Sequence, residues 1–80
     1  DLNPSTKTKM VFDGAGVFNP ATPAGRNIHF GVREHVMGAV MNGMALERLR
    51  SYGSGFLIFS DYGRGSIRLA ALMRLPVLYV

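Results

Sequence analysis

The run from Arg33 to Arg48 constrains the fold of this chain more than any other feature. Ala, Met, Val and Leu dominate the run, and apolar residues fall on nearly every side of the helix that it predicts. A helix that is apolar all round lies inside a protein or at an interface. Gly38 and Gly43 interrupt it, and each costs up to about 1 kcal/mol relative to Ala. We therefore expect another backbone or a ligand to pack closely against this helix.

Predicted strands and helices alternate in the second part of the chain, after an irregular first part. Residues 1–27 are predicted to be irregular, because proline and glycine recur too often for a long element. From residue 28 onward the predicted order is strand, helix, strand, helix and strand, over residues 28–32, 33–48, 56–60, 65–74 and 77–80. Pro76 ends the second helix. This β-α-β-α-β order predicts an α/β fold with a parallel sheet and right-handed crossovers.

The size of the chain limits what it does alone. It has 80 residues, of which 48% are hydrophobic. A domain of this size buries only about 60% of its unfolded surface, so a stand-alone fold would be marginally stable. The absence of an initiator Met and the end inside an apolar strand also predict a fragment. We therefore interpret residues 1–80 as one partial domain, which oligomerises or belongs to something larger.

The composition of the chain limits its cellular location and the classes of partner that it binds. The chain has no cysteine, which excludes disulfides and thiolate metal sites. No apolar run reaches the roughly 20 residues of a membrane span, and the first residues lack the regions of a signal peptide. The formal charge is +4, but the basic residues are scattered, with no dense stripe among exposed aromatics. We expect a soluble cytoplasmic protein without a nucleic-acid or membrane partner.

Two short motifs have ordinary structural interpretations. The run from Gly63 to Arg68 begins like a dinucleotide-binding fingerprint, but Arg68 replaces the third glycine and no matching acid follows. A turn and a helix start explain it better. His29 and His35 are six residues apart and flank Glu34, whereas metal-binding histidines on a helix usually stand four apart. We predict no metal site from them.

One carboxyl group and three aromatic rings remain as candidates for a binding site. Glu34 stands where the short apolar strand is predicted to become the helix, and there it could simply favour the helix dipole. The alternative is a buried acid used for proton transfer. Phe56, Phe59 and Tyr62 recur at three-residue intervals. They could be ordinary core, or they could bind a flat heteroaromatic ligand with a protonatable nitrogen.

Longer runs resemble one enzyme family. These are residues 25–46, GRNIHFGVREHVMGAVMNGMAL, residues 56–62, FLIFSDY, and residues 67–77, IRLAALMRLPV. They resemble transketolase, a thiamine-diphosphate enzyme, in the central domain that holds the aminopyrimidine ring of the cofactor. Residues 1–5 resemble the acidic-Leu-x-x-Ser segment that precedes these runs. Residues 47–55 depart from the family: the loop is one residue shorter and lacks the family's glycines.

The resemblance implies roles for individual residues. Glu34 matches the catalytic glutamate that hydrogen-bonds a ring nitrogen of the aminopyrimidine. Phe59 matches the ring that stacks on it. The other implied contacts are those of Phe56, Tyr62, Val32 and Asp1 with the cofactor, and of Ser5 with the phosphate of the sugar substrate.

The resemblance also implies an activity. A complete transketolase transfers a two-carbon ketol unit from a ketose phosphate to an aldose phosphate, in the pentose phosphate pathway. It uses thiamine diphosphate with Mg²⁺ or Ca²⁺, and its active site lies at the interface of a homodimer. The motif that binds the diphosphate and the metal is absent here, so the chain alone is expected to be inactive. The rival hypothesis is a truncated, non-catalytic fragment that acts as an interaction module.

Overall fold

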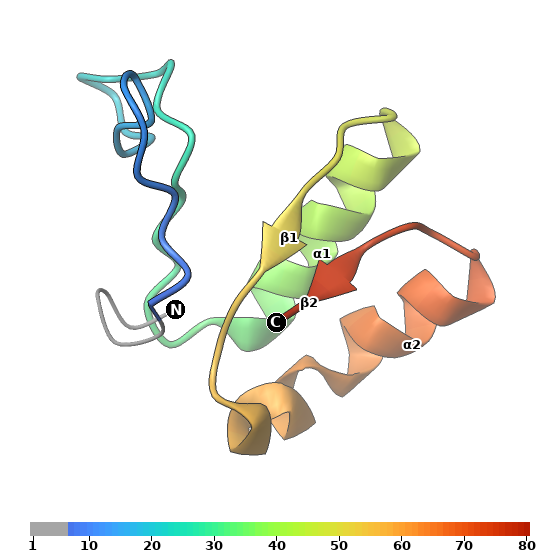
Figure 1. Ribbon diagram of the computed structural model, residues 1–80. Helices are drawn as coiled ribbons and strands as arrows, with labels where there is room; N and C mark the ends of the chain where they lie inside the picture. Colours follow the sequence, from blue (N-terminus) through green and yellow to red (C-terminus); the bar gives the residue numbers. More distant parts are fainter. Residues whose placement is uncertain (1–6) are drawn as a thin grey trace.

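The computed structural model describes residues 7–80 as a small α/β unit with an irregular lobe on one side (Figure 1). The elements, in chain order, are the helix α1 (Glu34–Leu46), the strand β1 (Tyr52–Gly53), the 3₁₀ helix η1 (Leu57–Gly63), the helix α2 (Arg64–Leu72) and the strand β2 (Leu78–Tyr79). β1 and β2 pair in parallel, with Tyr52 opposite Leu78 and Gly53 opposite Tyr79. The two predicted helices and the parallel pairing are thus confirmed.

The prediction of a strand over residues 28–32 was wrong. Gly31 has φ +65°, which an extended strand does not contain. Arg33 closes the bend, because its backbone N–H donates to the Gly31 carbonyl (3.0 Å) and its guanidinium Nη1 donates to the Phe30 carbonyl (2.8 Å). Residues 28–32 therefore lead into α1 as a bent segment.

The prediction of a strand over residues 56–60 was also wrong. This segment begins η1, and the Phe59 N–H donates to the Phe56 carbonyl three residues earlier (2.9 Å). A 3₁₀ helix has three residues per turn, so side chains at three-residue intervals share one face. The spacing of Phe56, Phe59 and Tyr62 fits this period, whereas it alternates faces on a strand. The strand of this region is β1, within the predicted loop.

The core is small and lies between α1, β1 and α2. Its buried apolar residues are Met37, Met41 and Ala70, with Ala15 in the irregular lobe. Gly53 lets β1 approach α1, since a Cβ atom there would lie 2.6 Å from the Met41 sulfur. Within the described chain α1 buries only one stripe and leaves Val36 and Leu46 exposed, so the alternative that this helix lies at an interface stays a prediction.

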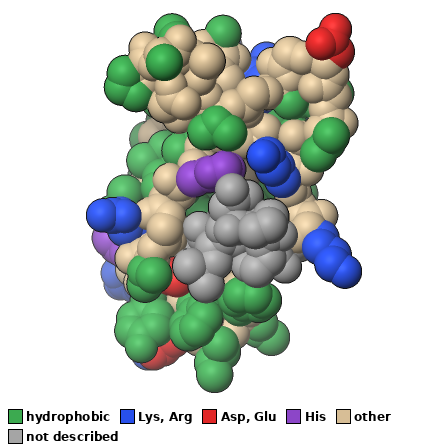
Figure 2. Space-filling view, turned by 90° about the vertical axis from the view of Figure 1, so that its left-hand side faces the viewer, with side chains coloured by type: hydrophobic (Ala, Val, Ile, Leu, Met, Phe, Trp, Pro, Cys, Tyr) green, Lys and Arg blue, Asp and Glu red, His purple; other side chains and the backbone are tan. Residues whose placement is uncertain are grey.

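Large apolar side chains cover much of the surface. Leu57 is 87% exposed and Ile58 77%, although both belong to the apolar run that was expected to be buried. Figure 2 shows hydrophobic side chains gathered at the lower end of one face. Among the described residues, no helix is long and apolar enough to cross a membrane.

Asn27 holds the irregular lobe together. Its side-chain oxygen accepts from the Met10 N–H (2.9 Å), and its amide nitrogen donates to the carbonyls of Met10 (3.1 Å) and Gly16 (2.9 Å). Gly25 sits against the backbone of Val17, where a Cβ atom would lie 2.2 Å from the Val17 carbonyl carbon. Residues 7–27 form isolated β-bridges but no helix or strand, in agreement with the predicted irregular segment.

Candidate functional site

Glu34 is the first residue of α1 and is buried, with 8% of its surface exposed. Its position at the helix N-terminus is favourable for a negative charge, an effect of about 0.3–1 kcal/mol that exposed carboxylates also obtain. Burial is not needed for that effect, and it costs solvation of the carboxylate. The structure therefore buries most of the surface of Glu34, which is compatible with the alternative interpretation.

The aromatic run, defined as Phe56, Phe59 and Tyr62, forms a continuous set of ring contacts. The Phe56 and Phe59 centroids are 6.2 Å apart with the rings inclined at 72°, and those of Phe59 and Tyr62 are 6.3 Å apart at 31°. Such pairs contribute about 0.5–1.5 kcal/mol beyond area burial. Phe56 is 43% exposed and Tyr62 68%. These exposures do not fit ordinary core within the described chain.

Tertiary packing brings Glu34 and the aromatic run to the same end of the molecule. The last residue of η1, Gly63, is buried against the first turn of α1. A Cβ atom on Gly63 would lie 3.7 Å from the Glu34 carbonyl oxygen, and one on Gly65 would lie 3.0 Å from Cε1 of His35. In Figure 1 the start of α1 and the turns of η1 meet at the lower end. The two most distinctive sequence features are therefore neighbours.

The other predicted site residues are either exposed or outside the described part of the chain. Val32 precedes Glu34 by two residues and is 76% exposed. Asp1 and Ser5 lie outside the described residues. His29 and His35 are both exposed. No group of three or more His, Cys, Asp or Glu residues that could hold a metal occurs within residues 7–80.

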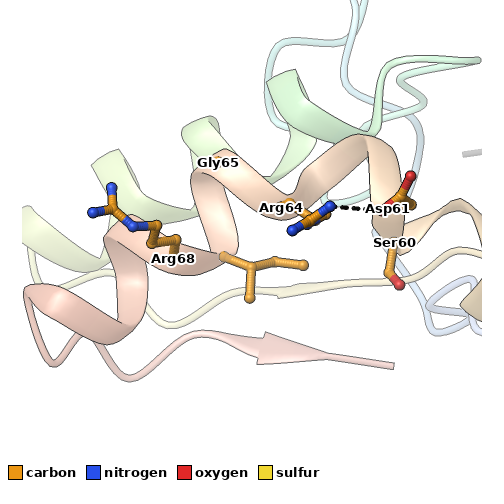
Figure 3. A pocket seen from close by; sticks show the side chains of 6 residues that line it. Ser60, Asp61, Arg64, Gly65 and Arg68 are labelled. Atoms are coloured by element: carbon orange, nitrogen blue, oxygen red, sulfur yellow. Dashed lines mark hydrogen bonds and ion pairs between the residues drawn. The ribbon is translucent and has the colours of Figure 1, made fainter.

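A hollow of about 540 Å³ lies beside the junction of η1 and α2 (Figure 3). It is lined by Ser60, Asp61, Arg64, Gly65, Ile67 and Arg68, and none of the predicted site residues is among them. Figure 3 shows Arg64 and Asp61 turned toward one another, in an exposed ion pair of 3.4 Å. Exposed pairs of this kind contribute at most about 1 kcal/mol. Gly63 and Gly65 join two helices here, so the strand-to-helix context of a dinucleotide fingerprint is absent.

Sequence reasoning missed two buried polar residues between α1 and α2, Asn42 and Ser66, although it expected a close approach at Gly38. The Asn42 amide donates to the Ser66 carbonyl (2.9 Å), and the Ser66 hydroxyl donates to the Gly63 carbonyl (2.9 Å). Gly38 lies against Ser66, which is only 1% exposed. The available signal was the four-residue spacing of Glu34, Gly38 and Asn42, which places them on one helix face.

Tyr79 adds a pH-dependent element to the same region. Its hydroxyl is buried near Ser66, yet within the described residues it forms no hydrogen bond of ordinary geometry. Burial raises the pKa of Tyr79 above its usual 10.0, and the Ser66 hydroxyl opposes this by a smaller amount. The folded state therefore favours the neutral phenol, and the unfolded state ionises first as the pH rises.

We expect the free energy of unfolding to fall as the pH rises above 10, and Tyr79→Phe to reduce that fall. At pH 7 the variant should be as stable as the parent or more so, because an unpaired buried hydroxyl costs about 1–3 kcal/mol. Urea denaturation at pH 7 and at pH 10.5 measures both effects. Tyr62→Phe is the control, since its ring is exposed. Equal pH dependence in parent and Tyr79→Phe would contradict this account.

Comparison with known proteins gives matches over the whole chain. The family described as "Transketolase, pyrimidine binding domain" matches residues 1–80. A transketolase of Physarum polycephalum is 53% identical and one of Geobacillus stearothermophilus 56%, each over 81 aligned residues that cover 100% of this chain and 12% of the relative. A transketolase of Dictyostelium discoideum is 61% identical over 79% of this chain and 10% of its own length. No solved structure gives a significant match. The chain thus spans about an eighth of these relatives or less.

Proposed function

We propose, from the premise that this chain belongs to the transketolase pyrimidine-binding domain family, that it forms the aminopyrimidine pocket of a complete transketolase. The complete enzyme would transfer a two-carbon ketol unit from a ketose phosphate to an aldose phosphate. Since the chain spans 12% of its relatives, most of the machinery for binding sugar and diphosphate would lie elsewhere in that enzyme. The interpretation of residues 1–80 as one partial domain is part of this proposal.

The observation that carries the proposal is that a buried glutamate and a set of aromatic rings lie at the same end of the molecule. Glu34 is 8% exposed, and η1, which carries the aromatic run, ends against its helical turn. A flat heteroaromatic ring with a protonatable nitrogen needs these two kinds of group: a carboxyl for the nitrogen and ring faces for stacking. The residues present therefore suit the aminopyrimidine of thiamine diphosphate.

Each residue of the pocket has its own task in this proposal. Glu34 would hydrogen-bond a ring nitrogen of the cofactor and would exchange a proton with it. Phe59 stacks on the ring, and its contacts with Phe56 and Tyr62 hold it in place. Val32 supplies an apolar surface beside Glu34. When bound, thiamine diphosphate supplies the carbanion chemistry, and the protein supplies position and electrostatics.

The remaining contacts are also proposals. Asp1 would lie near the cofactor and Ser5 would contact the sugar phosphate; the structure does not describe either residue. Mg²⁺ or Ca²⁺ would be bound by another part of the complete enzyme; within residues 7–80 there is no group of three or more potential metal-ligating side chains. A homodimer with the active site at its interface would cover part of the exposed apolar surface.

The second candidate is a non-catalytic interaction module. The exposed apolar side chains, with Leu57 at 87% and Val11 at 87%, favour it for the isolated polypeptide, because they offer a surface for another protein. This candidate predicts no thiamine diphosphate binding in any context. It differs from the first in the role of Glu34, which would then be only a helix-terminal residue.

Calorimetric titration with thiamine diphosphate in the presence of Mg²⁺ tests the proposal. We expect the complete protein to bind one cofactor per chain and the isolated 80 residues to bind none. The complete protein should also form a ketose phosphate product from a ketose donor and an aldose phosphate. Absence of cofactor binding in the complete protein would overturn the first candidate and favour the interaction module.

A further inference from the structure

A single line of contacts connects Glu34 with the end of η1. We call it the α1–α2 seam and define it as Glu34, Gly38 and Asn42 on α1 together with Gly63 and Ser66 on the facing segment. The three α1 residues follow one another at four-residue spacing and are all buried. Gly63 and Ser66 are buried as well. The seam therefore runs along one face of α1, starting at the predicted catalytic carboxyl.

The seam is fixed by two hydrogen bonds and two close approaches. The Ser66 hydroxyl donates to the Gly63 carbonyl, and the Asn42 amide donates to the Ser66 carbonyl, both at 2.9 Å. Gly63 rests on the backbone of Glu34, where a Cβ atom would be in ordinary contact at 3.7 Å. Ser66 rests on Gly38. The Asn42–Ser66 bond thus joins α2 to α1, and the Ser66–Gly63 bond joins the first turn of α2 to the end of η1.

The approach of Ser66 to Gly38 is the tightest contact of the seam. A Cβ atom on Gly38 would lie 2.2 Å from the Ser66 hydroxyl oxygen, 2.8 Å from Ser66 Cβ and 2.9 Å from the Tyr79 hydroxyl. Rotation of the Ser66 side chain would move its oxygen but not its Cβ atom, so a rotamer change cannot relieve the overlap. Any side chain at position 38 must therefore push α2 away from α1.

We propose that Gly38 and Ser66 are positioning residues that set the distance between Glu34 and the aromatic run, an inference that rests on the proposed function. In this role both residues would act through Glu34 and the aromatic run, without contacting the cofactor. η1 ends at Gly63 and α2 begins at Arg64, so the two helices are continuous and a displacement of Ser66 moves the end of η1. A displacement of about 1 Å at a reacting group reduces a rate by about 10²-fold.

The test compares two glycine-to-alanine variants of the complete protein. Gly38→Ala introduces the overlap, whereas Gly43→Ala makes the same change on the same helix at a position where a Cβ atom meets nothing within 4 Å. We expect Gly38→Ala to lower kcat by about 10²-fold and to weaken thiamine diphosphate binding, with the KM for the sugar phosphates little changed. Gly43→Ala should keep the parent values of all three quantities.

A compensating substitution at position 66 tests whether the effect of Gly38→Ala can be reversed. Gly38→Ala combined with Ser66→Gly, made in a Tyr79→Phe background, removes all three atoms that crowd position 38. We expect this variant to recover the kcat and cofactor affinity lost through the overlap, up to the level of Ser66→Gly in the same Tyr79→Phe background, which also lacks the hydrogen bond to Gly63. A general loss of stability would not be restored by adding a second glycine to a helix, because that change is itself destabilising.

A second variant covers the case in which Gly38→Ala does not fold. Ser66→Ala removes the hydrogen bond to Gly63 and the interaction with the Tyr79 hydroxyl, and we expect cofactor binding about 3-fold to 10-fold weaker. Equal behaviour of Gly38→Ala and Gly43→Ala, parent-like cofactor binding in Ser66→Ala, or a failed rescue would overturn the proposal. If Glu34→Gln leaves turnover unchanged, it is the proposed function that fails, so the two failures are distinguishable.

Discussion

Glu34→Gln is expected to reduce the turnover of the complete enzyme by roughly 10²-fold to 10⁴-fold, and Glu34→Ala by at least as much. Gln keeps the size of the side chain and its capacity for hydrogen bonds, but it cannot gain or lose a proton. If Glu34 exchanges a proton with the aminopyrimidine, this is the function that the substitution removes. Because Glu34 is buried beside Gly63, solvent water cannot readily replace it.

Steady-state kinetics measure the loss of turnover, and calorimetric titration with thiamine diphosphate measures any change in cofactor affinity. Glu47→Gln is the matched control, since Glu47 is exposed and lies at the other end of α1. Stability should change little, because the charge of Glu34 at the helix N-terminus contributes about 0.3–1 kcal/mol. Turnover within 2-fold of the parent in Glu34→Gln would reject a proton-transfer role for this residue.

Phe59→Ala is expected to weaken thiamine diphosphate binding by roughly 5-fold to 150-fold. Stacking of a heteroaromatic base on an aromatic side chain contributes about 1–3 kcal/mol, and each 1.4 kcal/mol corresponds to a factor of ten in affinity. Phe59 is the middle ring of the aromatic run, in contact with both Phe56 and Tyr62. Its loss should also free those two rings.

Phe59→Tyr and Ile58→Ala separate stacking from general effects on the segment. Phe59→Tyr keeps the ring and should bind the cofactor nearly as the parent does. Ile58→Ala truncates the neighbouring side chain, which is 77% exposed and does not belong to the ring contacts. Calorimetry on the three variants gives the comparison. Parent-like affinity in Phe59→Ala would show that the aromatic run is not the stacking surface.

The secondary structure of the aromatic run was only partly predictable from the spacing of its residues. The three-residue interval of the rings was visible in the sequence, and the three rings were interpreted together, either as core or as a ligand-binding set. Yet the apolar composition of residues 56–60 indicated a strand, because a short apolar run suits a buried strand or a helical segment equally. The hydrogen bond from the Phe59 N–H to the Phe56 carbonyl resolves this in favour of a 3₁₀ turn.

The sequence by itself determined the two helices, the parallel order and the family. α1 was predictable because a long apolar run has only one way to satisfy its backbone hydrogen bonds locally. The end of α2 was predicted from Pro76 to within two residues, since the helix ends at Leu72 instead of residue 74. The family followed from long runs whose residues agree in order and spacing, and residues 1–80 match it throughout.

Only the tertiary structure decided how these pieces meet. Glu34 and Gly63 are 29 positions apart in the numbering, and nothing local to either one specifies that their backbones touch. The same holds for Gly38 and Ser66, whose close approach depends on the height at which α2 crosses α1. Strands of two residues are equally undetermined by local sequence, since pairing between Tyr52 and Leu78 creates them. Contacts between distant segments depend on the whole packing arrangement, and a pattern within one segment does not contain that information.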